Sequence, residues 1–427
     1  MAKERDVLKQ LTGAETLEER TWIITDQLLS GVSQAVREAT LAVAVPHWFN
    51  EDVLRALLPE QSDEIGSVYE QLVEFSFVEP HGTRGYRLHE LTCKAVIGHL
   101  SKEKPGWYKE LRQRAHRHFE MLPGDNEQIE AIYHEFVFDE VAAVGKLLNL
   151  FWDLDYREET AAMSLLLDYI GEHEGWLAPQ TNLWLRYLNG RRLVVARDRE
   201  QAVKILDPLT TEATDTPLEP WVLIELAKMK ERAGDTVTAR GEYKRALALA
   251  QAFQDDRCIA RACGCLGDSL SRGEQFEEAI KYYEDALAVD RKRKDQRREC
   301  EQLRGLGDIY LRRKWWKAAE EYYRNSLKLA QSLSDVTLEA WALNRLGRLE
   351  EDMQHWDAAI EWYQQSRELF EHLNQYGNVA TVIRDIGDVL KGAKRYDQAK
   401  AAYQQAADTY REIGDRVEEA GTFNRMG

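Results

Sequence analysis

A 40-residue period in the C-terminal half constrains the fold more than any other feature of this chain. Five glycines stand one period apart, and each of the first four is followed by an aromatic residue, an alanine, a tyrosine and a small residue at fixed spacing. The columns are Gly267, Gly307, Gly347, Gly387 and Gly427; Phe276, Trp316, Trp356 and Tyr396; Ala279, Ala319, Ala359 and Ala399; Tyr283, Tyr323, Tyr363 and Tyr403; and Ala286, Ser326, Ser366 and Ala406. Such a period predicts a solenoid, because no single repeat can bury its hydrophobic face alone.

The columns also predict the two helices of each repeat. The glycine lies in a first helix where a neighbour must approach closely, and the alanine, tyrosine and small residue share one face of a second helix. The tyrosines are expected to fill the space between repeats. One further copy has Ala227 in the glycine column and Tyr243 in the tyrosine column, and a worn copy begins at Gly190 with Ala202. Trp316 and Trp356 occupy the packing column of the repeat, so we expect them in the core and not in a cofactor site.

These columns resemble the tetratricopeptide repeat, whose usual period is about 34 residues. The six additional residues imply longer helices, as in the extended repeats of kinesin light chains and of the G-protein-signalling adaptors. The resemblance covers about half of the chain. It implies that the first helices line a concave groove that binds a protein or peptide ligand.

The resemblance also implies which residues face this groove, namely those three before and one after each glycine. In the extended-repeat adaptors an asparagine in the earlier column commonly hydrogen-bonds the backbone of a bound peptide, and Asn344 and Asn424 match that column. Trp341, one turn earlier, would add an apolar wall. The predicted groove residues are Asp268, Arg304, Asp308, Trp341, Asn344, Arg348, Arg384, Asp388 and Asn424.

An alternative interpretation applies to part of this set. Arg304 and Asp308 are four residues apart on one predicted helix, as are Arg384 and Asp388. Oppositely charged side chains at this spacing can pair with each other on a helix surface. In that case they would contribute to helix stability and would not contact a ligand.

The front of the chain predicts a different unit, in which helices surround a short hairpin. The expected helices run from Leu17 through Val36 and over 51–58, 64–75 and 90–100, and the strand-like runs are 75–79 and 86–90, joined by the glycine-containing turn 80–85. Short apolar runs that flank such a turn predict a β-hairpin. Three helices followed by a hairpin form the winged-helix pattern, and the helix over 90–100 closes the unit. The predicted fold class is therefore mainly α with one small hairpin.

Residues 76–96 (SFVEPHGTRGYRLHELTCKAV), after 42–58 (AVAVPHWFNEDVLRALL), resemble the winged-helix domain of the signal-transduction ATPases called STAND or NB-ARC proteins. This family includes immune receptors, bacterial antiphage sensors and bacterial regulators. Its winged helix carries a Met-His-Asp motif, and Leu88-His89-Glu90 stands in that place here. In the family the histidine reaches the β-phosphate of ADP, so the resemblance implies that His89 is a nucleotide sensor. The alternative is that His89 only caps the helix that begins at Glu90.

The chain departs from that family at the nucleotide site. No G-x-x-x-x-G-K-[ST] string is present to cradle phosphates. ADP or ATP with Mg²⁺ would therefore be bound by a nucleotide-binding domain supplied in cis in a longer parent protein. We expect no cofactor, metal site or catalytic residue in this chain, and hence no enzyme. Its end within the first helix of a repeat also favours an excerpt from a longer protein.

The charge of the chain limits the classes of partner that it can bind. The net charge is −17, and residues 257–427 carry 28 basic and 30 acidic side chains (net −2), so −15 belongs to residues 1–256. Residues 20–103 hold 7 Arg or Lys against 12 Asp or Glu, which disfavours direct nucleic-acid binding by a winged helix.

No apolar run is long enough to cross a membrane. The five cysteines are an odd count and indicate reduced, mostly buried thiols and a cytoplasmic location.

The predicted organisation has four parts. They are a remnant of a preceding helical domain (1–18), the winged-helix domain (19–103), a helical bridge with degenerate repeats (104–216), in which 126–154 has apolar residues at helical spacing, and the repeats (217–427). The leading hypothesis is the sensor region of a STAND ATPase: the solenoid binds a trigger, and the winged helix relays that event to a nucleotide switch that then oligomerises. The alternative is a standalone scaffold adaptor without nucleotide dependence. A transcription regulator is a third, disfavoured hypothesis.

Overall fold

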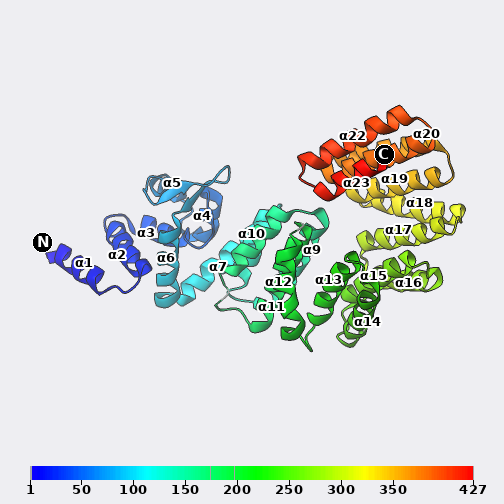
Figure 1. The fold of residues 1–427 in the computed structure, drawn as a ribbon. Coiled ribbons are helices and arrows are strands. Elements are labelled where there is room, and N and C mark those ends of the chain that lie inside the picture. The colour runs from blue at the N-terminus through cyan, green and yellow to red at the C-terminus, as the bar shows by residue number, and fades with distance from the viewer. Residues whose placement is uncertain (1, 174, 197, 427) are drawn as a thin grey trace. The chain divides into compact units, whose positions relative to one another are not determined.

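The computed structural model describes residues 2–173, 175–196 and 198–426, which are mostly helical (Figure 1). The mainly α fold class is therefore confirmed. The chain divides into two compact units, Met1–Leu206 and Asp207–Gly427. This division falls inside the segment 104–216 predicted as a bridge, and the other predicted boundaries stay predictions. Among the described residues, no helix combines the length and apolar character needed to span a membrane.

The first unit begins with helices that surround a two-stranded hairpin. The elements are α1 (Ala2–Gly13), α2 (Leu17–Leu29), α3 (Gln34–Ala42), α4 (Glu51–Leu57), η1 (Pro59–Gln61), α5 (Ile65–Val73), β1 (Val78–Pro80), β2 (Tyr86–Leu88) and α6 (Glu90–Glu103). The single helix predicted from Leu17 through Val36 is wrong, because the chain turns after α2 and Ser33 starts α3. The hydroxyl of Ser33 accepts a hydrogen bond from the backbone N–H of Val36 at 3.3 Å. We call residues 17–103 the hairpin module.

The hairpin extends to a third backbone segment through Phe49. Val78 in β1 pairs with Leu88 in β2, and on the other edge of β2 Phe49 and Tyr86 exchange two backbone hydrogen bonds of 2.7 and 2.8 Å. Gly85 (φ 127°) makes this approach possible, since a Cβ atom there would lie 2.3 Å from the carbonyl oxygen of Phe49. A continuous core of buried apolar side chains from α3, α4, α5, the hairpin and α6 fixes the module and continues onto the next helix.

Six helices follow the hairpin module, and the last of them crosses the boundary between the two units. They are α7 (Pro105–Glu120), α8 (Asp125–Glu135), α9 (Glu140–Arg157), α10 (Thr160–Gly171), α11 (Pro179–Val195) and α12 (Arg199–Glu212). The segment 126–154 is divided between α8 and α9, because Asp139 caps a new helix by accepting a hydrogen bond from the N–H of Ala142 at 3.0 Å. The worn repeat is visible in α11 and α12. A Cβ atom on Gly190 would lie 2.6 Å from Leu206, which stands in the tyrosine column.

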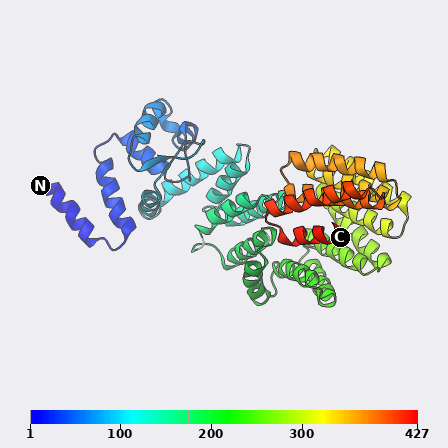
Figure 2. The same ribbon diagram turned by 45° about the horizontal axis from the view of Figure 1, so that its top comes forward.

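The second unit is a row of helix pairs stacked in sequence order. Its helices are α13 (Glu219–Arg232), α14 (Thr236–Ala252), α15 (Asp256–Arg272), α16 (Phe276–Arg293), α17 (Gln296–Arg312), α18 (Trp316–Ser332), α19 (Val336–Asp352), α20 (Trp356–His372), α21 (Tyr376–Gly392), α22 (Tyr396–Glu412) and α23 (Arg416–Met426). Each packs on the next, as the green-to-red end of Figure 1 and the adjacent α22 and α23 in Figure 2 show. The first helices of neighbouring repeats also contact one another, which places them on the inner side of the row.

The glycine and tyrosine columns form one packing unit. A Cβ atom on Gly307 would lie 2.4 Å from the ring of Tyr323, and the same holds for Gly347 and Tyr363 at 2.9 Å. The tyrosine of the second helix therefore packs on the bare backbone of the first helix. Tyr283 contacts Gly267 of its own repeat and Gly305 of the next one. This confirms that the tyrosines fill the space between repeats.

Candidate functional site

The first candidate site is the inner face of the second unit, formed by one side of the first helices. The predicted groove residues all lie on these helices, from Asp268 on α15 to Asn424 on α23. Their surroundings differ, however. Asp268, Arg348 and Asn424 are exposed, whereas Asn344 is 2% exposed and the others are half-buried.

The aspartates of this face hold the tyrosine column in place. The hydroxyl of Tyr323 donates to Asp308 at 2.6 Å, that of Tyr403 donates to Asp388 at 2.8 Å, and Tyr283 donates to Asp268. Burial and then the neighbouring carboxylate raise the pKa of Tyr323 well above its ordinary value, so the hydroxyl stays protonated and donates. These three aspartates therefore have a structural role in the free protein.

In two repeats the tyrosine hydroxyl donates its hydrogen bond to a different carboxylate. Lys228 and Arg348 replace the aspartate that follows the glycine column, and there the hydroxyl donates to an acid one turn later. Tyr243 donates to Glu231 at 3.3 Å, and Tyr363 donates to Glu351 at 2.9 Å. The basic side chain at Arg348 is thereby left exposed on the inner face.

The arginine and asparagine positions are bound into contacts between repeats. Arg384 donates to Glu418 of the next first helix at 2.6 Å, and Asp308 pairs with Arg345 at 3.0 Å. Asn344 accepts from Arg345 at 3.0 Å and donates to Asp385 at 3.4 Å. Asp308, Asn344 and Arg384 thus each have at least one partner on a neighbouring repeat.

Trp341 lies near two guanidinium groups. The Arg304 and Arg345 guanidinium carbons are each 5.9 Å from its ring centroid, and its ring meets Phe370 edge-on at 5.2 Å. Arg345 and Asp385 stand two residues before the glycines, outside the two columns that were predicted to face the groove. That position is charged in the last three repeats, as Arg345, Asp385 and Arg425, but not at Cys265 and Gly305, so the signal was partial.

The tryptophan columns differ from expectation. Trp316 is 40% exposed and donates to Asp352 at 2.7 Å, so the prediction that it belongs to the core is wrong. Trp356 is half-buried and packs on the backbone of Gly392 in the next repeat. Both residues lie at the start of a second helix, and of the two only Trp356 has a glycine of the next repeat against its ring.

His89 lies at the N-terminus of α6. Its backbone carbonyl starts the helix by accepting from Cys93 at 3.0 Å, and its backbone N–H donates to Phe77 at 2.8 Å. The side chain is exposed and makes no capping hydrogen bond among the described residues. The ring is therefore placed at the positive end of a helix dipole, a location that suits contact with an anionic group.

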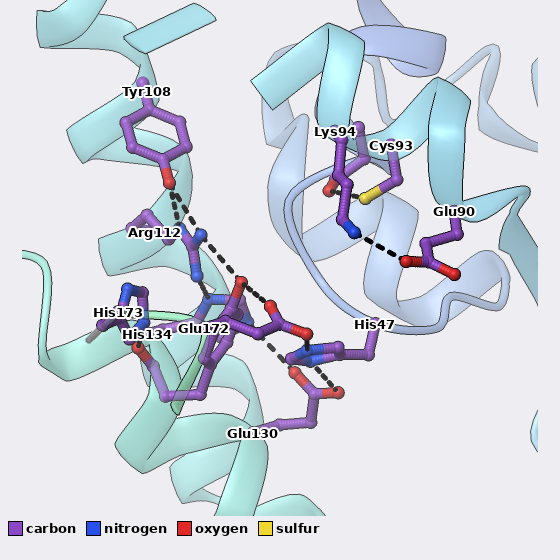
Figure 3. A network of polar contacts seen from close by, with 12 residues as sticks. His47, Glu90, Cys93, Lys94, Tyr108, Arg112, Glu130, His134, Glu172 and His173 are labelled. Atoms are coloured by element: carbon purple, nitrogen blue, oxygen red, sulfur yellow. Dashed lines mark hydrogen bonds and ion pairs between the residues drawn. The ribbon is translucent and has the colours of Figure 1, made fainter. Parts of the chain in front are cut away.

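A second candidate site, which the sequence did not indicate, is a partly buried polar network in the first unit (Figure 3). His47, in the segment between α3 and α4, contacts Glu130 of α8 with Nδ1 at 3.0 Å and Glu172, just after α10, with Nε2 at 3.4 Å. Its ring stacks on Tyr169 with centroids 3.5 Å apart. These contacts tie the hairpin module to the helices that follow, and we call this network the polar junction.

Arg112 of α7 forms the other half of the polar junction and is 1% exposed. It donates to the hydroxyls of Tyr108 at 2.7 Å and Tyr133 at 3.0 Å, and Nη1 lies 3.1 Å from Nδ1 of His134. Tyr133 in turn donates to Glu172 at 3.1 Å. The buried cation is therefore linked through one tyrosine to a carboxylate that also binds His47.

The junction sets opposite protonation states on its histidines. Burial alone would lower the pKa of His47, but the carboxylates of Glu130 and Glu172 outweigh it and raise the pKa to about 9. Burial and then the charge of Arg112 lower the pKa of His173 to about 4 and hold that of His134 well below its ordinary value. One protonated and two neutral histidines therefore occupy the same site at neutral pH.

Neither site has the side chains of a metal centre. Among the described residues no group of three or more His, Cys, Asp or Glu side chains is arranged to hold a metal ion. The five cysteines are free thiols, of which Cys258, Cys263 and Cys300 are buried. Burial raises the pKa of the Cys93 thiol, which donates a hydrogen bond to the carbonyl of Ala44 at 3.1 Å.

Comparison with known proteins agrees with this architecture. The family model described as "Tetratricopeptide repeat" matches residues 218–292, 299–372 and 338–412. No curated protein sequence matches the chain significantly. Among solved structures, a STAND protein with a tetratricopeptide repeat sensor from Pyrococcus horikoshii is similar with a TM-score of 0.59 and 15% identity, over 99% of this chain and 68% of that one.

A second solved structure is similar over a shorter range. A Rap protein complexed with competence and sporulation factor matches with a TM-score of 0.54 and 16% identity, over 64% of this chain and 77% of that one. At these identities the likeness is one of fold. Together with the family match and the stacked helix pairs, it shows that residues 218–292 and 299–412 of this chain are tetratricopeptide repeats.

Proposed function

We propose that this chain is the ligand-sensing and regulatory region of a STAND signal-transduction ATPase. The observation that carries the proposal is the fold likeness over 99% of the chain to a STAND protein with a tetratricopeptide repeat sensor. Because that likeness includes both units, it supports a sensor in the second unit and also the assignment of the hairpin module to the same kind of protein. In this proposal the chain itself is not an enzyme, and a nucleotide-binding domain in cis supplies the site for ADP or ATP with Mg²⁺.

The trigger is a protein or peptide that binds along the inner face of the second unit. The similar Rap protein is complexed with competence and sporulation factor, which supports binding by this type of solenoid. Asp268, Arg348 and Asn424 are the predicted groove residues that remain exposed for such a ligand. Asn344 would have to release Arg345 and Asp385 before it could bind a peptide backbone.

The hairpin module is the winged helix that relays ligand binding in this proposal. The hairpin, its third backbone segment at Phe49 and the helices around them support this assignment. The polar junction connects the module to α8 and to the end of α10, so movement of those helices would be transmitted to the module. His89 is exposed on the module and suits contact with the β-phosphate of ADP held by the parent protein. A trigger shifts this equilibrium only if it binds the open state more tightly.

The test starts with the reading frame upstream of Met1 in the source genome, where the proposal expects a P-loop domain. The full-length protein is then purified and the release of bound ADP is followed. His89→Ala should release ADP about tenfold faster or more, because a hydrogen bond to a charged group is lost. His81→Ala, in the turn of the same hairpin, is the matched control and should behave as the wild type.

Two outcomes would contradict the proposal. A genuine start at Met1 with no ATPase in the same polypeptide would leave a scaffold adaptor that binds a protein partner without nucleotide dependence. Equal ADP release from the His89 and His81 variants would remove the relay role of His89.

A further inference from the structure

An exposed aromatic cluster lies at the turn that joins α17 to α18. Trp315 and Trp316 are 53% and 40% exposed, and Tyr310 and Tyr322 lie half-buried beside them. We call these four residues the aromatic corner. None of them belongs to the columns that were predicted to face the groove. Large exposed aromatic side chains that gather at one place commonly mark a surface for a partner.

The corner is held in one conformation. The ring of Tyr310 stacks on Trp315 with centroids 5.9 Å apart and on Tyr322 at 5.3 Å with an interplanar angle of 9°. The guanidinium of Arg313 lies 4.3 Å from the Trp315 ring centroid, and Arg313 also pairs with Glu277 at 3.1 Å. A ring fixed in this way loses little conformational freedom when a partner covers it.

Neither helix capping nor core packing within the repeat explains why a tryptophan occupies position 315. The equivalent position in the other repeats is polar, and Asp235 there caps α14 by accepting from the N–H of Thr238. Trp315 is the N-terminal cap residue of α18 but provides no side-chain cap. Capping favours a short polar residue at this position, and a buried role is excluded by the exposed fraction of the ring.

The turn of the corner is basic although the chain is acidic, whereas the carboxylates of Glu284 and Glu321 lie near Tyr322. Residues 310–317 (YLRRKWWK) contain four basic residues and no acidic one, whereas the whole chain has a net charge of −17. Arg312, Lys314 and Lys317 are exposed around the two tryptophans. The side chain of Lys314 is presented by a turn residue with φ 57°. An apolar surface with a cationic rim is complementary to an apolar group with anionic neighbours.

We propose that the aromatic corner docks an acidic segment of a partner protein. An apolar side chain of that segment packs on Trp315 and Trp316, while flanking carboxylates face Lys314 and Lys317. Glu277 and Asp352 contact the corner and would repel the continuous charge of a nucleic acid, so a peptide with a few placed carboxylates fits better. This site goes beyond the proposed function and does not depend on a nucleotide-binding domain.

The test uses the full chain and a labelled peptide of glutamate pairs separated by phenylalanine. Fluorescence anisotropy should show saturable binding that weakens with added salt, because the screening length falls to about 8 Å at physiological ionic strength. Trp315→Ala should weaken binding about tenfold or more. Lys314→Asn combined with Lys317→Gln should weaken it and reduce the salt dependence, and asparagine tolerates the left-handed backbone at residue 314.

Matched controls keep the result interpretable. Tyr396→Ala removes an aromatic ring that is 63% exposed in another repeat and should leave binding unchanged. Trp315 makes no capping bond, so its removal should leave the melting temperature close to that of the wild type. Equal binding by the Trp315 and Tyr396 variants, or no binding of the peptide, would overturn the proposal. Binding of single-stranded oligothymidylate in place of the peptide would also overturn it and identify a nucleic-acid surface.

Discussion

At the scale of single residues, the tyrosine column combines two requirements. Its ring packs on a glycine of the first helix, and its hydroxyl needs a carboxylate because a buried phenol without a partner is costly. The ring requirement is met by glycine in four repeats and by alanine at Ala227. The hydroxyl requirement is met by either of two positions on the first helix, which leaves the other position free to vary.

The glycine column gives the first prediction. Gly307→Ala should destabilise the protein by about 1–3 kcal/mol, because the new Cβ atom would overlap the ring of Tyr323. Gly241→Ala should instead stabilise it by up to about 1 kcal/mol, since that glycine lies in the interior of α14 with nothing within 4 Å of its Cβ position. Urea unfolding of the two variants measures both effects. A similar cost for both substitutions would show that ring packing is not the reason for the column.

The polar junction gives a prediction about pH. His47 has a folded pKa of about 9 and an ordinary value of 6.5, so it binds its proton more tightly in the folded state. The contribution of His47 to the free energy of unfolding is complete below pH 6.5 and is lost as the pH rises towards 9. His173, with a folded pKa of about 4, has the opposite effect, and stability is lost as the pH falls from 6.5 towards 4. The free energy of unfolding of the first unit should therefore decline on both sides of about pH 6.5.

Single substitutions separate the loss of stability above pH 6.5 from the loss below it. His47→Gln should remove most of the decline between pH 6.5 and 9, and His173→Gln should reduce the decline on the acid side. Thermal unfolding followed across this pH range gives the comparison. An alkaline limb that persists unchanged in His47→Gln would show that another group causes it.

At the scale of helices, each 40-residue repeat consists of two halves of equal length. Turn residues with left-handed backbone conformation recur every 20 residues, at the end of first and second helices alike. They are Gly234, Gln254, Glu274, Lys294, Lys314, Ser334, Gln354, Asn374, Lys394 and Gly414. Most of these residues are not glycine, which is why composition did not reveal the shorter period.

The starts of the first helices give the third prediction. Asp255, Asp295 and Asp335 each cap their helix by accepting from the N–H three residues later, at 3.0, 3.2 and 3.1 Å. Gln375 occupies the same position before α21 and makes no side-chain cap. Gln375→Asp should therefore stabilise the protein by about 1 kcal/mol, and Asp335→Ala should cost a similar amount. Chemical denaturation of both variants tests this, and a destabilised Gln375→Asp variant would contradict it.

At the scale of the whole molecule, the two compact units differ in how they are held together. The second unit repeats one local contact pattern, whereas the first unit is held by a continuous apolar core and by unrepeated polar contacts such as the polar junction. Substitutions in one unit that share no partners with the other are expected to act independently.

This difference gives the fourth prediction, which hydrogen exchange can measure. His47→Gln should reduce the protection of amides in α8 and near the end of α10, because both lose a partner of the junction. The amides of α15 to α22 should keep their protection. An equal loss across α15 to α22 would show that the chain behaves as one cooperative unit.

The sequence predicted the second unit well because its determinants are local. The fold class, the first and second helices and the packing of tyrosine between repeats follow from residues within one period, and all are confirmed. The predicted groove residues do lie on the first helices, but the sequence did not identify their partners on neighbouring repeats. Arg384 binds Glu418 and Asn344 binds Asp385, at separations of 34 and 41 residues, because neighbouring repeats stand side by side.

By itself, then, the sequence determined that this chain builds a solenoid, since a repeated pattern specifies the same nearest-neighbour contact each time. Only the tertiary structure decided where unrepeated side chains meet. His47 is 83 residues from Glu130 and 125 from Glu172, and no spacing rule connects them. The exposure of Trp316 was likewise settled by what lies opposite it, because a ring is buried only where a neighbouring element supplies a surface to cover it.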